Sequence, residues 1–115
     1  MTENSTPSAS IVLSTAGSPE EAARISRELV ERRLAACVSR LPGLTSVYRW
    51  QGAVEEADEV LLLIKTSTEK LAALESALRE LHSYEVPEFL VLPVTGGSQA
   101  YLEWLLASVG SPDSN

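Results

Sequence analysis

The stretch EVLLLIKTS, residues 59–67, holds five apolar side chains in a row. A strand with one wet face would alternate apolar and polar residues, so this run predicts a strand that is buried on both faces. An acidic segment, VEEADE at residues 54–59, leads into it, and Gly52 stands just before that segment. Because glycine accepts the backbone conformations of tight reversals, we expect a long hairpin with residues 36–52, bent at Pro42–Gly43 and acidic in its exposed outer half.

The residues before the hairpin predict a strand and a helix. SIVLSTA, residues 10–16, is short, apolar and partly β-branched, which favours a buried first strand. Ser18 suits a helix N-cap, Pro19 suits the first helical position, and Glu21 stands where a capping box places its acidic partner. The expected apolar stripe of this helix comprises Ala22, Ile25, Leu29 and Val30.

The residues after the hairpin predict a second helix, a fourth strand and a third helix. Leucines recur at three- and four-residue spacing between Ser67 and His82, as on the buried side of a helix. PEFLVLPVT, residues 87–95, favours a strand, and after two glycines residues 99–109 favour a short helix. The leucines of the second helix are Leu71, Leu74, Leu78 and Leu81.

The order of these elements predicts an α+β fold of the ferredoxin-like βαββαβ type, with an antiparallel sheet and an extra C-terminal helix. Two helices can cover only one face of the sheet. Residues 60–64 and 89–92 are nevertheless apolar at consecutive positions, which requires a cover on the second face as well. We therefore expect a homo-oligomer that assembles through the sheet.

Length and charge restrict the function further. A chain of 115 residues is one ordinary domain, which we place at residues 10–109 between flexible tails at 1–9 and 110–115. A net charge of -7 disfavours binding to nucleic acid and to anionic membranes. The N-terminal residues do not resemble a signal peptide, and a single cysteine allows no disulfide within the chain, so we expect a cytoplasmic protein.

The residues that could carry chemistry are few. His82 can serve as the basic end of its helix, or it can act as a ligand together with Tyr84, Glu85 and Glu88. Cys37 can be a small buried thiol or a soft metal ligand. A catalytic set of cysteine, histidine and glutamate lacks an oxyanion loop in this sequence, so we expect no enzyme.

The other surfaces that could bind a ligand, nucleic acid or phosphate are better explained by their structural roles. Tyr48 and Trp50 fall on one strand face and suit packing better than ligand stacking. The first helix pairs its own charges, with Glu20 before Arg24 and Glu28 before Arg32, as on a solvated face. The strand at residues 59–67 has no aromatic residue, which excludes an RNA-recognition sheet. Glutamates at the start of the first helix exclude a phosphate site there.

Five stretches in order carry a resemblance to a known family: ERRLAACV, PGLTSVYRWQG, EVLLLIKT, LHSYEVPE and YLEWL. Over residues 10–108 the chain resembles the CutA family of divalent-cation tolerance proteins. The resemblance implies a ferredoxin-like subunit in a stable homotrimer, similar in architecture to PII-type signalling proteins. It also implies a link to copper and other divalent cations, with Cys37 and His82 at positions discussed as metal contacts, and it implies no enzymatic reaction.

Two positions depart from the family pattern. Ser39 stands where asparagine is common, and Ser83 stands where proline is common, which should loosen the backbone beside His82. Our leading expectation is a cytoplasmic homotrimer that binds Cu(II) or another divalent cation weakly at subunit clefts, with Cys37, His82 and Glu85 as ligands. The alternative is a PII-like signalling or scaffold trimer that binds a small metabolite or a partner protein. Its cleft would be lined by Tyr48, Trp50, Lys65, Tyr84 and Trp104.

Overall fold

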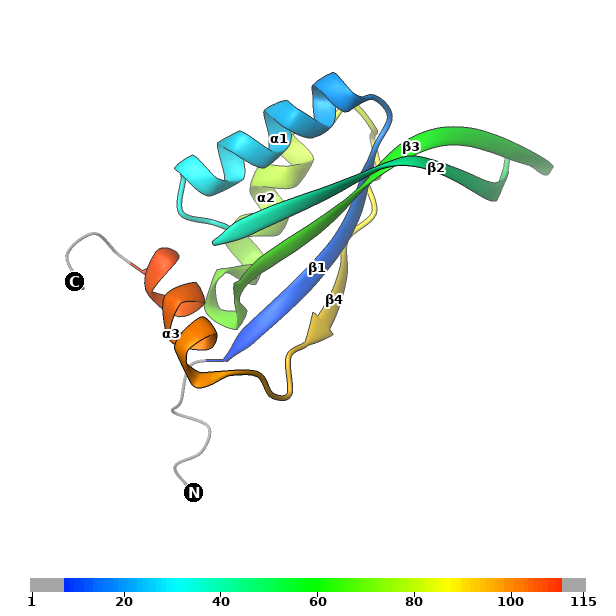
Figure 1. Ribbon diagram of the computed structural model, residues 1–115. Helices are drawn as coiled ribbons and strands as arrows, with labels where there is room; N and C mark the ends of the chain where they lie inside the picture. Colours follow the sequence, from blue (N-terminus) through cyan, green and yellow to red (C-terminus); the bar gives the residue numbers. More distant parts are fainter. Residues whose placement is uncertain (1–7, 111–115) are drawn as a thin grey trace.

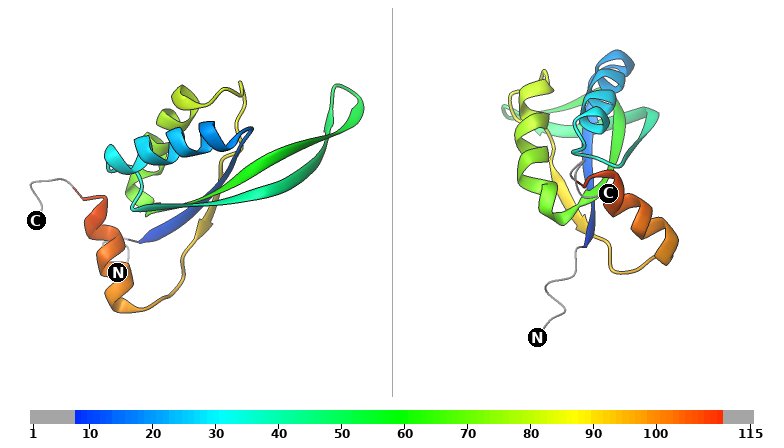
Figure 2. Two further views of the ribbon diagram at one scale, coloured as in Figure 1. Left: turned by 45° about the horizontal axis from the view of Figure 1, so that its top comes forward. Right: turned by 90° about the vertical axis from the view of Figure 1, so that its left-hand side faces the viewer.

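The computed structural model describes residues 8–110, which form a sheet layer and a helix layer (Figure 1). The four strands are antiparallel in the order β2-β3-β1-β4, and α1 and α2 lie together on one side of them (Figure 2, left). This confirms the predicted ferredoxin-like α+β fold with an extra C-terminal helix. The elements are β1 (Ala9–Ala16), α1 (Pro19–Glu31), β2 (Cys37–Trp50), β3 (Ala53–Ser67), a 3-10 turn (Thr68–Lys70), α2 (Leu71–Leu81), β4 (Leu90–Pro93) and α3 (Gln99–Ser108).

Strands β2 and β3 form the predicted hairpin, and its outer part extends well past the rest of the molecule (Figure 1). The pairing shifts register between Leu41 and Leu44, where Gly43 has a φ of 82°, so the expected bend is a β-bulge. Gln51 and Gly52 close the turn with φ of 50° and 83°. Two successive positive φ angles are typical of the turn whose twist matches that of a hairpin.

The start of α1 confirms its predicted cap, with one difference. The Ser18 hydroxyl accepts a hydrogen bond from the Glu21 backbone at 3.1 Å, and Pro19 begins the helix. The Glu21 carboxylate, expected to return to the cap, instead accepts two hydrogen bonds from Ser83 in the segment after α2. This carboxylate also lies 4.0 Å from Arg24, so the partner of Arg24 is Glu21 and our expected pairing with Glu20 was wrong.

The core lies between the sheet and the two helices. Alternate residues of β3 face this layer, which buries Val60, Leu62 and Ile64 completely or nearly so. Ser14 on β1 is also fully buried, and its hydroxyl has no hydrogen-bond partner among the described residues. The other core side chains are Val12, Ala16, Ala22, Ile25, Leu29, Ala35, Leu74, Ala77 and Leu78.

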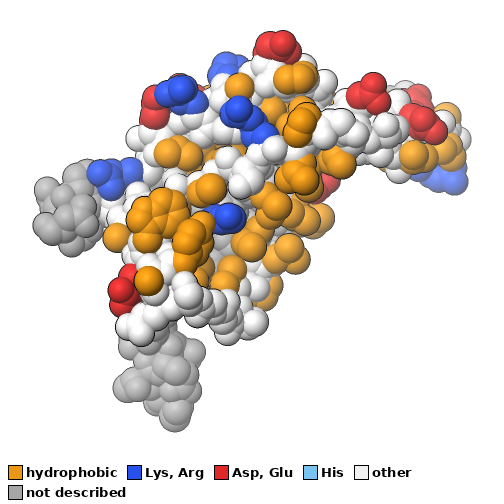
Figure 3. Space-filling view, in the orientation of Figure 1, with side chains coloured by type: hydrophobic (Ala, Val, Ile, Leu, Met, Phe, Trp, Pro, Cys, Tyr) orange, Lys and Arg blue, Asp and Glu red, His pale blue; other side chains and the backbone are white. Residues whose placement is uncertain are grey.

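The second face of the sheet is open in a single chain. Leu61 and Leu63 are only half-buried, and Leu90 and Leu92 are 56% and 46% exposed. Hydrophobic side chains gather over this face (Figure 3). The expected burial on both faces is therefore met on one face only, and no element among residues 8–110 covers the other in full.

The last two elements sit at the edge of the sheet. Strand β4 is shorter than the predicted 87–95 and pairs with β1 only as far as Leu13. Farther along β1, beyond the end of the pairing with β4, the Thr15 carbonyl accepts a hydrogen bond from the His82 ring. Helix α3 packs against β3 and β1 through the buried Leu105. Strand β1 begins at Ala9, one residue earlier than expected; residues 1–7 and 111–115 lie outside the described structure.

None of the helices described within residues 8–110 is both long enough and apolar enough to cross a membrane.

Candidate functional site

His82 is buried where α2 ends, and both of its ring nitrogens are engaged. Nε2 lies 2.6 Å from the Thr15 carbonyl oxygen, and Nδ1 accepts a hydrogen bond from the Tyr84 backbone N–H at 3.0 Å. A carbonyl can only accept, so Nε2 carries the proton and Nδ1 is the acceptor. This arrangement stabilises one neutral tautomer and leaves no ring nitrogen free for a metal ion.

The carboxylate beside His82 is Glu21 of α1. Its Oε2 lies 3.6 Å from His82 Nδ1 and accepts a hydrogen bond from the Ser83 backbone at 2.7 Å, while Oε1 accepts from the Ser83 hydroxyl at 3.0 Å. Burial of Glu21 raises its pKa, but the hydrogen bonds from Ser83 outweigh that effect and hold the pKa below its ordinary value of 4.5. Two hydrogen bonds thus hold Ser83 in place, and one of them comes from a backbone N–H that a proline would lack. These bonds oppose the loosening of the backbone that we expected beside His82.

Tyr84 joins the same segment to the root of the hairpin. Its hydroxyl donates to Glu59 Oε2 at 2.7 Å, and Ser46 donates to Glu59 Oε1 at 2.7 Å. Burial, the hydrogen bond to Glu59 and the charge of that carboxylate raise the pKa of Tyr84 well above its usual range. The tyrosine also packs on Gly17, where an added Cβ would lie 3.1 Å from its hydroxyl oxygen.

These contacts form one cluster, which we call the hairpin-root network. It joins β1, α1, the end of α2 and the hairpin through hydrogen bonds that satisfy a buried histidine and two carboxylates. Buried polar groups that are fully satisfied hold a single arrangement. The members of the network are Thr15, Glu21, Ser46, Glu59, His82, Ser83 and Tyr84.

The three predicted metal ligands do not come together within one chain. Cys37 is the first residue of β2 and pairs with Lys65 on the open side of the sheet. Thr15, whose carbonyl contacts His82, pairs with Leu61, which lies four positions from Lys65 along β3. At about 3.3 Å per residue, four positions correspond to about 13 Å. Glu85 is exposed in the segment before β4. Among residues 8–110 no cluster of three or more His, Cys, Asp and Glu side chains could hold a metal ion. Cys37, His82 and Glu85 of a single chain therefore do not form a metal site.

The five residues of the alternative cleft are also dispersed. Tyr48 and Trp50 lie exposed on the outer hairpin, whereas Tyr84 lies at its root. The Lys65 ammonium lies 5.6 Å from the ring centre of Tyr101 on α3. Trp104 packs on Tyr101 with ring centroids 5.3 Å apart and lines a separate pocket beside α1. Of the two pockets described among residues 8–110, one is lined by Trp104 and neither is lined by any of the other four side chains.

Sequence reasoning missed four of the seven members of the network: Thr15, Glu21, Ser46 and Glu59. Glu21 was read only as a helix cap and Glu59 only as part of an acidic hairpin, because each is far in sequence from its partner. The single available signal was Ser83 itself: a serine in place of a proline adds a backbone donor and a hydroxyl, each of which can bond to a nearby carboxylate.

Comparison with known proteins agrees over nearly the whole chain. The family model described as CutA1 divalent ion tolerance protein matches residues 10–108. A divalent-cation tolerance protein CutA from Thermus thermophilus is 50% identical over 100 residues, which cover 87% of this chain and 97% of the relative.

Two solved structures have the same architecture. The divalent cation tolerance protein Cut A1 from Thermus thermophilus superposes with a TM-score of 0.87 at 49% identity, over 89% of this chain and 99% of the other. A structure titled as the periplasmic divalent cation tolerance protein CutA from Archaeoglobus fulgidus gives a TM-score of 0.86 at 35% identity, over 89% and 99%. The chain therefore belongs to the CutA1 divalent ion tolerance protein family.

Proposed function

We propose that this protein contributes to divalent-cation tolerance as a homotrimer that binds Cu(II) or a similar ion weakly at clefts between its subunits. The observation that carries the proposal is the open apolar face of the sheet, in a chain that belongs to the CutA1 family. An apolar face of this kind is stable in water only when another surface covers it. In a closed symmetric assembly each subunit supplies the cover for the next.

Assembly also bears on the metal site. Cys37, His82 and Glu85 are separated within one chain, so a site built from them needs ligands from more than one subunit. Thiol, imidazole and carboxylate groups together suit copper and zinc better than magnesium or calcium. In this proposal Cys37 is the soft ligand, His82 the nitrogen ligand, and Glu85 an oxygen ligand or a hydrogen-bonding partner of the site.

The hairpin-root network supports weak rather than tight binding in this proposal. A cation at His82 Nδ1 must first displace the Tyr84 N–H, which then needs another acceptor. Glu21, at 3.6 Å from the same nitrogen, is the carboxylate placed to share the cation, but it would have to release Ser83. Each displaced hydrogen bond subtracts from the affinity.

The test is calorimetric titration of metal-free protein with Cu(II) and Zn(II), on material whose mass has been measured by light scattering. We expect a trimer, saturable binding, and affinity at least tenfold lower in His82→Ala. Glu75→Gln, which removes an exposed carboxylate from α2, is the matched control and should leave the titration unchanged. Circular dichroism confirms that each variant is folded.

Two outcomes would overturn the proposal in different ways. A trimer that shows no saturable binding would refute the metal site and favour the signalling or scaffold role. Binding that survives His82→Ala would remove His82 from the site. The proposed role requires no catalytic step, and we place the protein in the cytoplasm, where its one thiol stays reduced. Fractionation of cells tests that location.

A further inference from the structure

Helix α1 ends in a backbone conformation that favours glycine, yet the residue there is arginine. The Arg33 backbone N–H donates to the Val30 carbonyl at 3.1 Å, and the Leu34 N–H donates to the Leu29 carbonyl at 2.9 Å. These two bonds form a Schellman motif, in which Arg33 takes the left-handed position with a φ of 59°. Glycine adopts such a φ freely, whereas an L side chain adopts it with strain. The helix end by itself therefore gives no reason for an arginine here.

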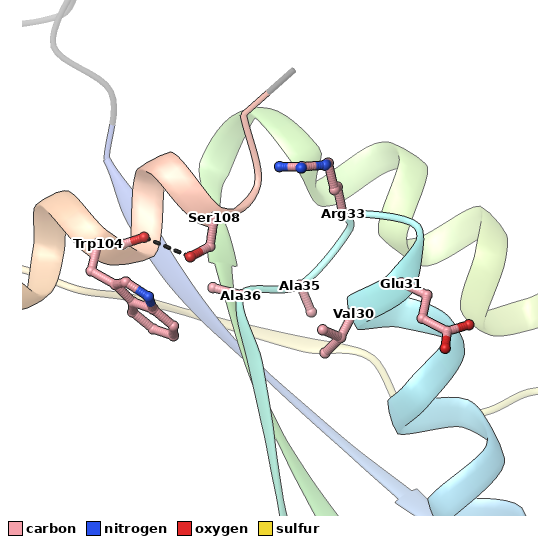
Figure 4. Close-up of a pocket in the computed structure, with 7 residues that line it drawn as sticks. All are labelled: Val30, Glu31, Arg33, Ala35, Ala36, Trp104 and Ser108. Carbon is pink, nitrogen blue, oxygen red and sulfur yellow. Dashed lines mark hydrogen bonds between the residues drawn. The ribbon is translucent and has the colours of Figure 1, made fainter. Parts of the chain in front are cut away.

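The Arg33 side chain extends over the rim of a pocket of about 430 Å³, which we call the α1–α3 pocket because it lies between these helices and the start of β2 (Figure 4). Val30 and the indole of Trp104 border it from opposite sides and are 42% and 48% exposed. The small side chains of Ala35 and Ala36 lie between them. A concave site of this size, with mainly apolar walls and one charged group, suits a small organic ligand.

Arg33 reaches this pocket with hydrogen-bond donors to spare. Its side chain is half-buried, and among residues 8–110 its guanidinium donates one long hydrogen bond, 3.4 Å to the Gly110 carbonyl. A guanidinium has five donors in all. Glu31 also lines the pocket, but its side chain points away and pairs with Arg27 at 3.6 Å (Figure 4). The charge of Arg33 is therefore not neutralised by Glu31.

Positive charge predominates around the pocket although the whole chain has a net charge of -7. A second hollow shares Val30 and Glu31 with the α1–α3 pocket and adds Arg27 and Arg40. Three arginines and one glutamate thus line the two hollows. Salt screens charges beyond about 8 Å at physiological ionic strength, so these near arginines count for more than the distant carboxylates. An anion bound in the pocket is therefore favoured by its surroundings.

We propose that the α1–α3 pocket binds a small aromatic carboxylate, with its ring against Trp104 and Val30 and its carboxylate paired to Arg33. A planar carboxylate matches the donor fork of one guanidinium through two parallel hydrogen bonds. The exposed indole offers the ring a surface for offset stacking. The pocket is lined by one chain, so this inference depends neither on the proposed metal site nor on the proposed trimer.

Calorimetric titration of the full-chain protein with 2-naphthoate tests the site. We expect one molecule bound per chain, with an affinity at least about tenfold lower in Arg33→Gln, which removes the charge. The neutral alcohol with the same rings, 2-naphthalenemethanol, should bind the wild-type protein at least about tenfold more weakly than the acid does. Arg79→Gln, which removes an exposed arginine from α2, is the matched control and should leave the affinity unchanged.

Nuclear magnetic resonance shows where the probe binds. The chain has two tryptophans, and Trp50→Phe assigns their indole N–H signals because Trp50 lies far out on the hairpin. The Trp104 signal should shift on addition of 2-naphthoate, while the Trp50 signal should stay in place. A shift of the Trp50 signal alone would overturn the proposal. Equal binding of acid and alcohol, or no binding of 2-naphthoate to the folded wild-type protein, would also overturn it.

Arg33→Gly separates a role in binding from a role at the helix end. Glycine relieves the strain at a φ of 59°, so we expect this variant to unfold at a higher urea concentration than wild type. We also expect it to bind 2-naphthoate at least about tenfold more weakly, because the guanidinium is gone. A lower urea midpoint together with unchanged binding would show that Arg33 serves the helix end and would overturn its assignment as a ligand-binding residue.

Discussion

Tyr84 and Glu21 connect the segment after α2 to two distant parts of the chain. Tyr84 donates to Glu59 on the hairpin, and Glu21 on α1 accepts from Ser83. Both carboxylates lie among groups that are partly removed from water, where a hydrogen bond to a charged acceptor is stronger than at the surface. At the residue scale, these two contacts set the position of His82 relative to the sheet.

Tyr84→Phe should lower the free energy of unfolding by about 1–2 kcal/mol, because the Glu59 carboxylate loses one of its two donors. Urea denaturation measures the change. Tyr101→Phe is the matched control: its hydroxyl has only a long contact with Lys65, at 3.4 Å near the surface, so the effect should stay below about 0.5 kcal/mol. Equal losses in both variants would contradict a special role for Tyr84.

The pH dependence of stability should report Glu21. Its pKa is lowered on folding, so the folded state favours the ionised form, and this contribution is present above pH 4.5 and is lost as the pH falls below that value. Urea denaturation at a series of pH values should therefore show a decline that is shallower in Glu21→Gln. Glu20→Gln, a neighbour on the exposed side of α1, serves as control, and a decline of the same slope in all three proteins would disprove the assignment.

The hairpin is the element that distinguishes this molecule from a compact two-layer subunit. Its strands run past the last residue of β1 and so continue without a neighbouring strand in the same chain. Two devices shape it: the bulge at Gly43, which bends it, and the turn at Gln51 and Gly52, which reverses it. Both glycines have φ values that an L side chain adopts only with strain.

Gly52→Ala should destabilise the protein by about 1–2 kcal/mol, because alanine would be held at a φ of 83°. An added Cβ meets nothing within 4 Å at this position, so the loss would come from the backbone alone. Gly96→Ala has equal space and no positive φ, and should be nearly neutral. Thermal unfolding of the two variants side by side separates these effects, and equal melting temperatures would rule out strain at the turn.

The whole molecule carries an apolar sheet face opposite its helices (Figure 3). Leu61 and Leu63 lie at its centre, with Leu90 and Leu92 at the β4 edge. The chain has a net charge of -7, yet it leaves open an apolar surface that is unfavourable in water unless another surface covers it. The proposed trimer resolves this conflict by covering the face with other copies.

Leu92→Asp should shift the mass in solution from trimer to monomer, since a carboxylate buried in an apolar interface is strongly unfavourable. Light scattering measures the mass directly. Val86→Asp is the control, because Val86 is 84% exposed in the segment before β4 and lies outside the sheet. A Leu92→Asp protein that stays trimeric would show that the open face is not the interface.

The sequence alone determined the fold to within a few residues. Period-two and helical apolar patterns, the Ser18–Pro19 cap and the glycines of the hairpin are local signals, and each acts on the backbone within a few positions of itself. They predicted every strand and helix, and five stretches in register indicated the family. The local pattern was misleading at β4, where the apolar residues predicted a strand over 87–95. The observed strand pairs with β1 only as far as Leu13, and His82 binds the Thr15 carbonyl farther along.

Only the tertiary structure decided how the candidate site is arranged. Glu21 lies 62 residues from Ser83, Glu59 lies 25 from Tyr84 and Thr15 lies 67 from His82, and no local pattern records such pairings. Tertiary packing also showed that Cys37 and His82 are apart in one chain and that one sheet face stays open. The physical reason is the same in each case: backbone conformation depends on near neighbours, whereas the contacts of a side chain depend on which elements the folded sheet brings together.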